Sequence, residues 1–97
     1  MQTDEKLATS TPQIRNSKIN VTEWKFKPGE STGFHIHEFD YIVVPLTTGE
    51  LTAINSDDST TISNLEAGKS YFRQKGVEHN IVNTNSFDFT FVEIELL

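Results

Sequence analysis

From residue 18 onward, short runs of apolar and β-branched residues alternate with segments rich in Gly, Pro, Asn, Asp and Ser. This alternation is typical of β-strands separated by turns, and no stretch keeps the helical period of about 3.6 residues. Short strands at this spacing predict an all-β sandwich or jelly roll. The predicted strands are Ile19–Phe26, Gly33–His37, Tyr41–Leu46, Leu51–Asn55, Thr60–Ser63, Ser70–Arg73, His79–Asn83 and Phe87–Leu96.

The last predicted strand changes the side on which its apolar residues lie. Phe87, Phe89 and Phe91 share one parity, whereas Ile94 and Leu96 take the other, and the first predicted strand shows a similar change. A bulge would explain the change, and so would burial on both faces. Burial on both faces fits a barrel wall covered by a second subunit, so we expect a homodimer with strands covered or exchanged between subunits.

Residues 1–17 differ in composition from the rest of the chain. They are rich in Thr, Ser, Gln and charge, with Pro12 among them, and this predicts a flexible or partner-dependent N-terminal arm. The remaining residues, 18–97, are predicted to form one β-barrel domain, because 97 residues leave no room for a second core. Neither a signal peptide nor a membrane span is evident, so a cytoplasmic location is expected.

Charge and cysteine content exclude several kinds of partner. The net charge is −6, and no cluster of Lys and Arg offers the basic surface that nucleic acids or anionic membranes need. The chain has no cysteine, which excludes disulfides and thiolate metal sites. Any metal site must therefore use imidazole or oxygen ligands.

All three histidines lie in two short segments. His35 and His37 are two residues apart on one predicted strand, so they project from the same face. His79, on a distant predicted strand, can complete a ligand set around one metal ion.

The two segments resemble the motifs of the cupin superfamily. The first motif is matched at Gly29, His35 and His37, and the second at Gly68, Gly76, His79 and Asn83. The resemblance covers residues 18–97 and implies a cupin double-stranded β-helix, which is a jelly-roll barrel. It also implies that His35, His37 and His79 converge in the barrel mouth and bind a divalent metal ion, for which Fe, Mn, Zn or Ni are the candidates.

One departure from the family pattern affects the chemistry. The metal-binding glutamate of the first motif is absent, and Tyr41 stands four residues beyond His37 in its place. Asp40 is one position short, so strict alternation points it to the other face unless a bulge intervenes. A metal ion bound by three neutral imidazoles keeps its full charge and should favour a small anionic ligand. Tyr41 is a candidate catalytic or substrate-binding residue, and Arg73 is a candidate clamp for a substrate carboxylate.

These features lead to three functional hypotheses. The first is a metal-binding cupin that acts on or binds a small anionic metabolite, with a site similar to three-histidine dioxygenases. The second is a non-catalytic ligand-binding or sensing cupin with a degenerate metal site. The third is a metal-free isomerase, with His35 or His79 as base and Tyr41 as acid. The run 40–46 is also similar to small bacterial cupins named for β-alanine degradation.

Overall fold

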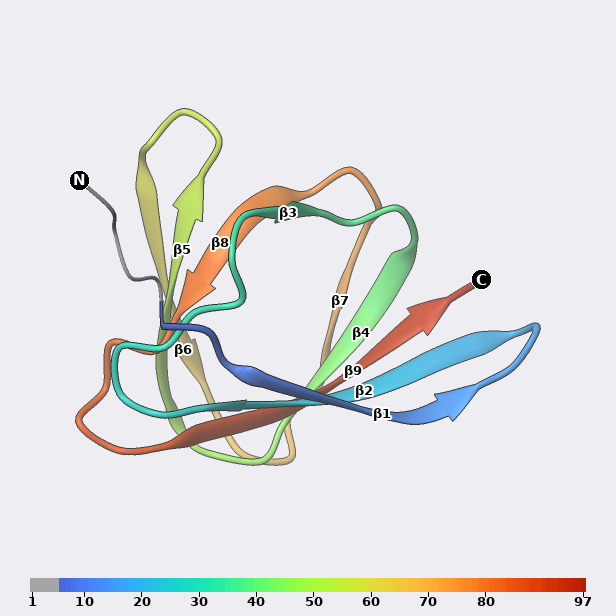
Figure 1. Ribbon diagram of the computed structural model, residues 1–97, viewed down its shortest axis with the longest axis horizontal. Helices are drawn as coiled ribbons and strands as arrows, with labels where there is room; N and C mark the ends of the chain where they lie inside the picture. Colours follow the sequence, from blue (N-terminus) through green and yellow to red (C-terminus); the bar gives the residue numbers. More distant parts are fainter. Residues whose placement is uncertain (1–5) are drawn as a thin grey trace.

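The computed structural model describes residues 6–97, which form nine β-strands and no helix (Figure 1). Within this range no helix is therefore available to span a membrane. The all-β prediction is confirmed. The strands are β1 (Thr9–Arg15), β2 (Ile19–Phe26), β3 (His35–Ile36), β4 (Asp40–Pro45), β5 (Gly49–Asn55), β6 (Thr60–Leu65), β7 (Tyr71–Arg73), β8 (Glu78–Val82) and β9 (Phe89–Leu96).

The strands form two sheets that face each other across a shared interior (Figure 1). One sheet has the order β1-β2-β9-β4-β7 and the other the order β3-β8-β5-β6, and all strand pairs are antiparallel. The chain crosses between the sheets repeatedly, as in a jelly roll. Aromatic and aliphatic side chains close one end of the interior, where Phe26 and Phe89 are fully buried.

Strand β1 is not among the predicted strands, because it lies within the segment predicted as an arm. Every residue of β1 is exposed, so it shows no alternation of buried and exposed side chains that would mark a strand. It is an edge strand paired with β2, and the register shifts between Pro12 and Ile14. Proline is tolerated at such an edge because its missing N–H is not needed there. Residues 1–5 of the predicted arm lie outside the described residues, and the arm's dependence on a partner stays a prediction.

The change of parity in β9 is not caused by a bulge between β2 and β9. Their register is continuous from Ile19 opposite Leu96 to Phe26 opposite Phe89. The inward positions of β9 simply continue from Phe91 to two glutamates, Glu93 and Glu95, which line a cavity. The interior is thus apolar at one end and polar at the other. In the half of β9 that carries Glu93 and Glu95, the apolar residues Ile94 and Leu96 lie on the outer face of the sheet.

Those outward residues form a continuous band that we call the outer row. Cross-strand pairs join its members over all five strands of the larger sheet: Ile14, Val21, Ile94, Ile42 and Phe72. Val21 is 7% exposed, whereas Ile14 and Phe72 are 45% and 51% exposed. Val21 is therefore buried, Ile94 and Ile42 are half-buried, and the two ends of the row are open.

Candidate metal centre and the cavity around it

The pairing of β3 with β8 brings the two histidine segments together. His35 lies directly opposite His79 in this antiparallel pair. His37 follows β3, and its backbone N–H donates to the Val77 carbonyl at 2.9 Å, while its carbonyl accepts from the Gly76 N–H at 2.8 Å. Gly76 has a φ of +94°, which a residue with a side chain rarely adopts. Gly76, in the second motif, thus forms the turn before β8, and these two backbone hydrogen bonds hold the turn against His37.

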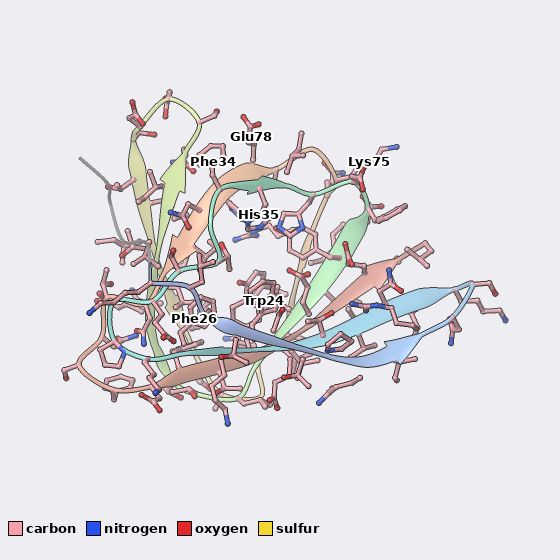
Figure 2. All side chains as sticks on the ribbon, in the orientation of Figure 1. Trp24, Phe26, Phe34, His35, Lys75 and Glu78 are labelled. Carbon is pink, nitrogen blue, oxygen red and sulfur yellow. The ribbon has the colours of Figure 1, made fainter. Side chains whose placement is uncertain are left out.

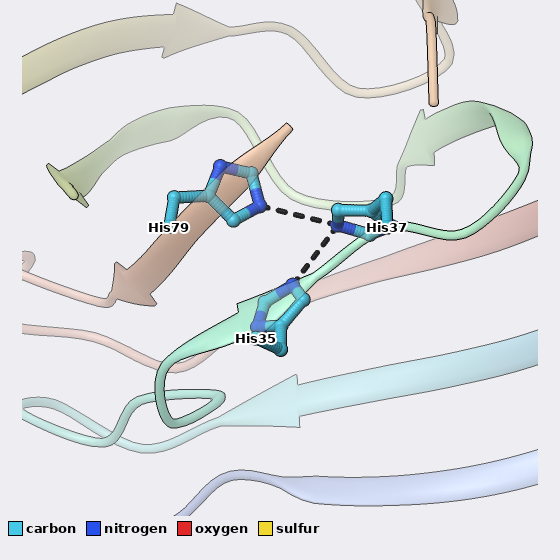
Figure 3. Close-up of side chains that lie close together, drawn as sticks. All are labelled: His35, His37 and His79. Atoms are coloured by element: carbon cyan, nitrogen blue, oxygen red, sulfur yellow. Dashed lines mark hydrogen bonds between the residues drawn. The ribbon is translucent and has the colours of Figure 1, made fainter. Parts of the chain in front are cut away.

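The three imidazoles point their Nε2 atoms at one another (Figure 3). The Nε2 atom of His37 lies 2.9 Å from that of His35 and 3.2 Å from that of His79. The Nδ1 atom of His35 lies 2.9 Å from the Gly33 carbonyl oxygen, which can only accept, so Nδ1 carries the proton and Nε2 has a free lone pair when the ring is neutral.

The spacing of these nitrogens fits a shared metal ion. Ligand nitrogens about 2.1 Å from one ion, at adjacent positions of its shell, lie about 3.0–3.4 Å apart. A single proton on His37 Nε2 can satisfy only one of its two neighbouring nitrogens, whereas a cation between the rings satisfies all three. The residues present therefore fit a divalent metal ion that accepts imidazole ligands.

The charge state of the histidines also suits metal binding. Burial, together with repulsion by the neighbouring His35 and His79, lowers the pKa of His37 to about 4. Burial, together with the positive charges of His35 and Arg73, likewise lowers the pKa of His79 to about 4. Both rings are neutral at pH 7, which is the form that binds metal ions.

Tyr41 occupies the position at which the family pattern has its glutamate, and Asp40 directly precedes it. The Tyr41 ring stacks on His37, with 3.9 Å between ring centroids and 15° between ring planes. Burial raises the pKa of Tyr41, and the nearby Glu93 adds to the rise, so the phenol stays protonated at neutral pH. Asp40 lies on the other face of β4, where its Oδ1 accepts from the Lys75 backbone N–H at 2.9 Å. It is therefore not part of the histidine group.

Two arginines line the same cavity from opposite edges of the larger sheet. Arg73 is exposed, and its guanidinium lies 4.7 Å from the centre of the Tyr71 ring. Arg15 donates from both terminal nitrogens to Thr22 Oγ1 at 3.3 Å. Arg73 thus lies at the cavity, as a substrate-binding role requires, whereas Arg15 was not among the candidates because it falls within the predicted arm.

Sequence reasoning also missed two acidic residues, Glu93 and Glu95. A carboxylate oxygen of each and a ring nitrogen of His37 all lie within 4.8 Å of one another. Burial, together with repulsion by Glu95, raises the pKa of Glu93 to about 7. Their parity with Phe89 and Phe91 was the signal that could have placed them inside, because residues two apart on a strand share a face.

These groups surround one cavity of about 470 Å³, a size typical of small-molecule sites. Trp24, Leu51 and Phe91 form part of its apolar wall, and the histidines, glutamates and arginines form its polar wall. Figure 2 shows Trp24 and His35 inside the space between the sheets and Glu78 outside it. The arrangement can hold a cation at the histidines and a small polar ligand beside it.

Comparison with known proteins found two curated relatives and many similar structures, although no family model matches. The chain is 45% identical over 89 residues to the beta-alanine degradation protein BauB of Pseudomonas aeruginosa, covering 92% of this chain and 93% of that protein. It is 30% identical over 88 residues to an oxalate-binding protein of Thermotoga maritima, covering 91% of this chain and 70% of that protein. A crystal structure of a cupin domain from Bordetella pertussis is 45% identical, with a TM-score of 0.93 and 99% coverage of both chains.

Proposed function

The chain belongs to the cupin superfamily, and on that premise we propose that it binds one divalent metal ion through His35, His37 and His79 and a small anionic metabolite beside it. The observation that supports this proposal is the convergence of the three Nε2 atoms, 2.9 and 3.2 Å apart, on one point of the cavity wall. Three neutral ligands leave the charge of the ion uncompensated, and this favours an anionic ligand.

The cavity offers groups that suit a small carboxylate. A bound divalent ion supplies Lewis acidity or, where it is redox-active, oxygen chemistry. The guanidinium of Arg73 can bind a carboxylate through two parallel hydrogen bonds. The protonated phenol of Tyr41, stacked on His37, is a proton or hydrogen-bond donor beside the same ligand. The names of the two relatives, one for oxalate binding and one for β-alanine degradation, both refer to small carboxylates.

A second candidate is a binding protein without catalysis. Tyr41 occupies the position at which the family pattern has a carboxylate ligand, and one relative is named for binding alone. Such a protein would bind the same ion and the same anion without turnover. Oxygen consumption by the Fe(II)-loaded protein, measured with a panel of small carboxylates and amino acids, separates the two candidates.

Metal content of the untagged protein tests the proposal. We expect close to one ion per chain in the wild type and in Glu78→Ala, whose side chain points away from the cavity (Figure 2). His79→Ala should lose the ion, and His79→Asn, which keeps a polar side chain of similar shape, should lose most of it. Circular dichroism checks that each variant is folded. A wild type that stays free of metal after reconstitution with iron, manganese, zinc and nickel would refute the proposal.

We also propose that the protein is a homodimer that buries its outer row. The open ends of this row, Ile14 and Phe72, are apolar and are 45% and 51% exposed. Burying such side chains in a symmetric contact is favourable. Light scattering should give the mass of two chains for the wild type and of one chain for Phe72→Asp. A monomeric wild type contradicts this proposal.

A further inference from the structure

We propose that the ligand of this cavity is a short amino acid bound as a zwitterion, with its carboxylate at the histidine group and Arg73 and its ammonium between Glu93 and Glu95. This inference rests on the proposed function, because it specifies the ligand class of the same cavity. It follows from the arrangement of charges along the inner face of the larger sheet, from the lack of partners for those charges, and from their distance to the histidines.

The first observation is a band of polar residues that we call the inner row. Cross-strand pairs join its members over all five strands of the larger sheet: Arg15, Asn20, Glu95, Tyr41 and Arg73. All but Asn20 line the cavity. Positive charges stand at the two ends of the row and a negative charge stands in its middle. A neighbouring position of β9 adds a second negative charge, Glu93, on the same face.

The second observation is that these charges do not neutralise one another. Within residues 6–97, no ion pair joins either glutamate to an arginine, and neither carboxylate makes a hydrogen bond. Arg15 donates to Thr22 Oγ1, and Arg73 lies over the ring of Tyr71. A partly buried carboxylate without a donor is unfavourable, and an incoming group that supplies positive charge and N–H donors relieves that cost. An alkylammonium group does both.

The third observation is the short distance between the acidic pair and the histidines. The carboxylate oxygens of Glu93 and Glu95 lie within 4.8 Å of a ring nitrogen of His37. A ligand whose negative end lies at the histidine group therefore has its positive end only a few bonds away. This separation fits an amine that is one to three carbons from a carboxylate. A dicarboxylate would place its second negative charge against the acidic pair, where repulsion disfavours it.

Paired ligands that differ only in the amine test this inference. Binding to the Co²⁺-loaded protein is measured by calorimetry for glycine and acetate, β-alanine and propionate, and 4-aminobutyrate and butyrate, together with malonate. We expect the amine to improve binding by about tenfold or more in at least one pair, because a hydrogen-bonded charge pair contributes at least that much. Malonate should bind more weakly than the best amino acid.

The double variant Glu93→Gln/Glu95→Gln identifies the source of the preference. We expect it to keep Co²⁺ and to bind both members of each pair with similar affinity. The matched control Glu50→Gln, on the exposed side of β5, should retain the wild-type preference.

Each outcome decides between the two proposals. If the simple acids or malonate bind Co²⁺-loaded wild type as tightly as the amino acids, the zwitterion inference is wrong and the proposed function stands. If the double variant loses Co²⁺, the glutamates serve the metal rather than an ammonium group, and the inference is again wrong. If the wild type binds neither Co²⁺ nor iron, manganese, zinc or nickel, both proposals fail.

Discussion

Replacing Glu93 by glutamine should stabilise the metal-free protein at alkaline pH. The pKa of Glu93 is raised from its ordinary value of 4.5 to about 7, chiefly because the carboxylate is buried. As the pH rises from 4.5 towards 7, the unfolded chain has already released this proton while the folded chain keeps it, so folding becomes less favourable. The loss of stability is complete above the folded pKa, and glutamine removes it because it never ionises.

The size of the effect follows from the pKa shift. A rise in pKa from 4.5 to about 7 corresponds to about 3 kcal/mol, and we take roughly half of this because the cavity admits water that screens the charge. For a domain of this size, about 1–2 kcal/mol corresponds to a change in Tm of roughly 4–16 °C. Glutamine has nearly the same shape as glutamate, so packing should change little.

The assay is thermal unfolding in the presence of a chelator, followed by circular dichroism at about pH 5 and about pH 8. Glu93→Gln should unfold at a clearly higher temperature than wild type at the alkaline pH and at a similar temperature at the acidic pH. The control Glu50→Gln removes an exposed carboxylate and should shift neither value. A Glu93→Gln variant with the wild-type Tm at both pH values, or with the same gain at both, would refute the reasoning.

Two other properties can be predicted. Because burial lowers the pKa of His37 and of His79 from 6.5 to about 4, the unfolded chain protonates first on acidification. As the pH falls from 6.5 to about 4, the free energy of unfolding of the metal-free protein should therefore decrease by roughly 3 kcal/mol, after allowance for screening. In urea unfolding, the double variant His37→Gln/His79→Gln should show a weaker dependence of this free energy on pH. The same pH dependence as in the wild type would contradict this. Asn83 is fully buried, and its side-chain amide donates to the carbonyls of Phe26 and Phe87 at 3.2 and 2.9 Å. Asn83→Ala should therefore lower the free energy of unfolding, measured in the same assay, by about 2–4 kcal/mol. A decrease below about 1 kcal/mol would show that water replaces these hydrogen bonds.

The fold could be predicted because its signals are local. Turn residues at fixed distances from the histidines produced the cupin resemblance, and the run of apolar and β-branched residues from Ile19 to Phe26 predicted the bounds of β2 as the structure has them. Strand β1 left no such signal, because its position on the sheet edge leaves every side chain exposed. Its stability comes from backbone pairing with β2, which a hydrophobic pattern does not record.

The acidic side of the cavity was harder to predict than the histidines. His35, His37 and His79 are rare side chains at motif positions, whereas Glu93 and Glu95 resemble ordinary surface residues between Val92 and Leu96. Sequence rules assume that inward residues are apolar, and a cavity lined by polar groups reverses that assumption for half of β9. The interpretation of the β9 parity change as a bulge or as two-sided burial followed from that rule, and the continuous register between β2 and β9 shows no bulge there.

The shortness of β3 has a kinetic consequence. This strand has two residues, His35 and Ile36, yet it and the residue after it present two of the three histidines. The segment buries little apolar surface, because Phe34 and Ile36 are 55% and 58% exposed. Segments with few buried contacts open far more often than the whole domain unfolds. Exchange of a bound ion should therefore require only that this segment separates from β8. The metal ion would enter and leave while the rest of the barrel stays folded.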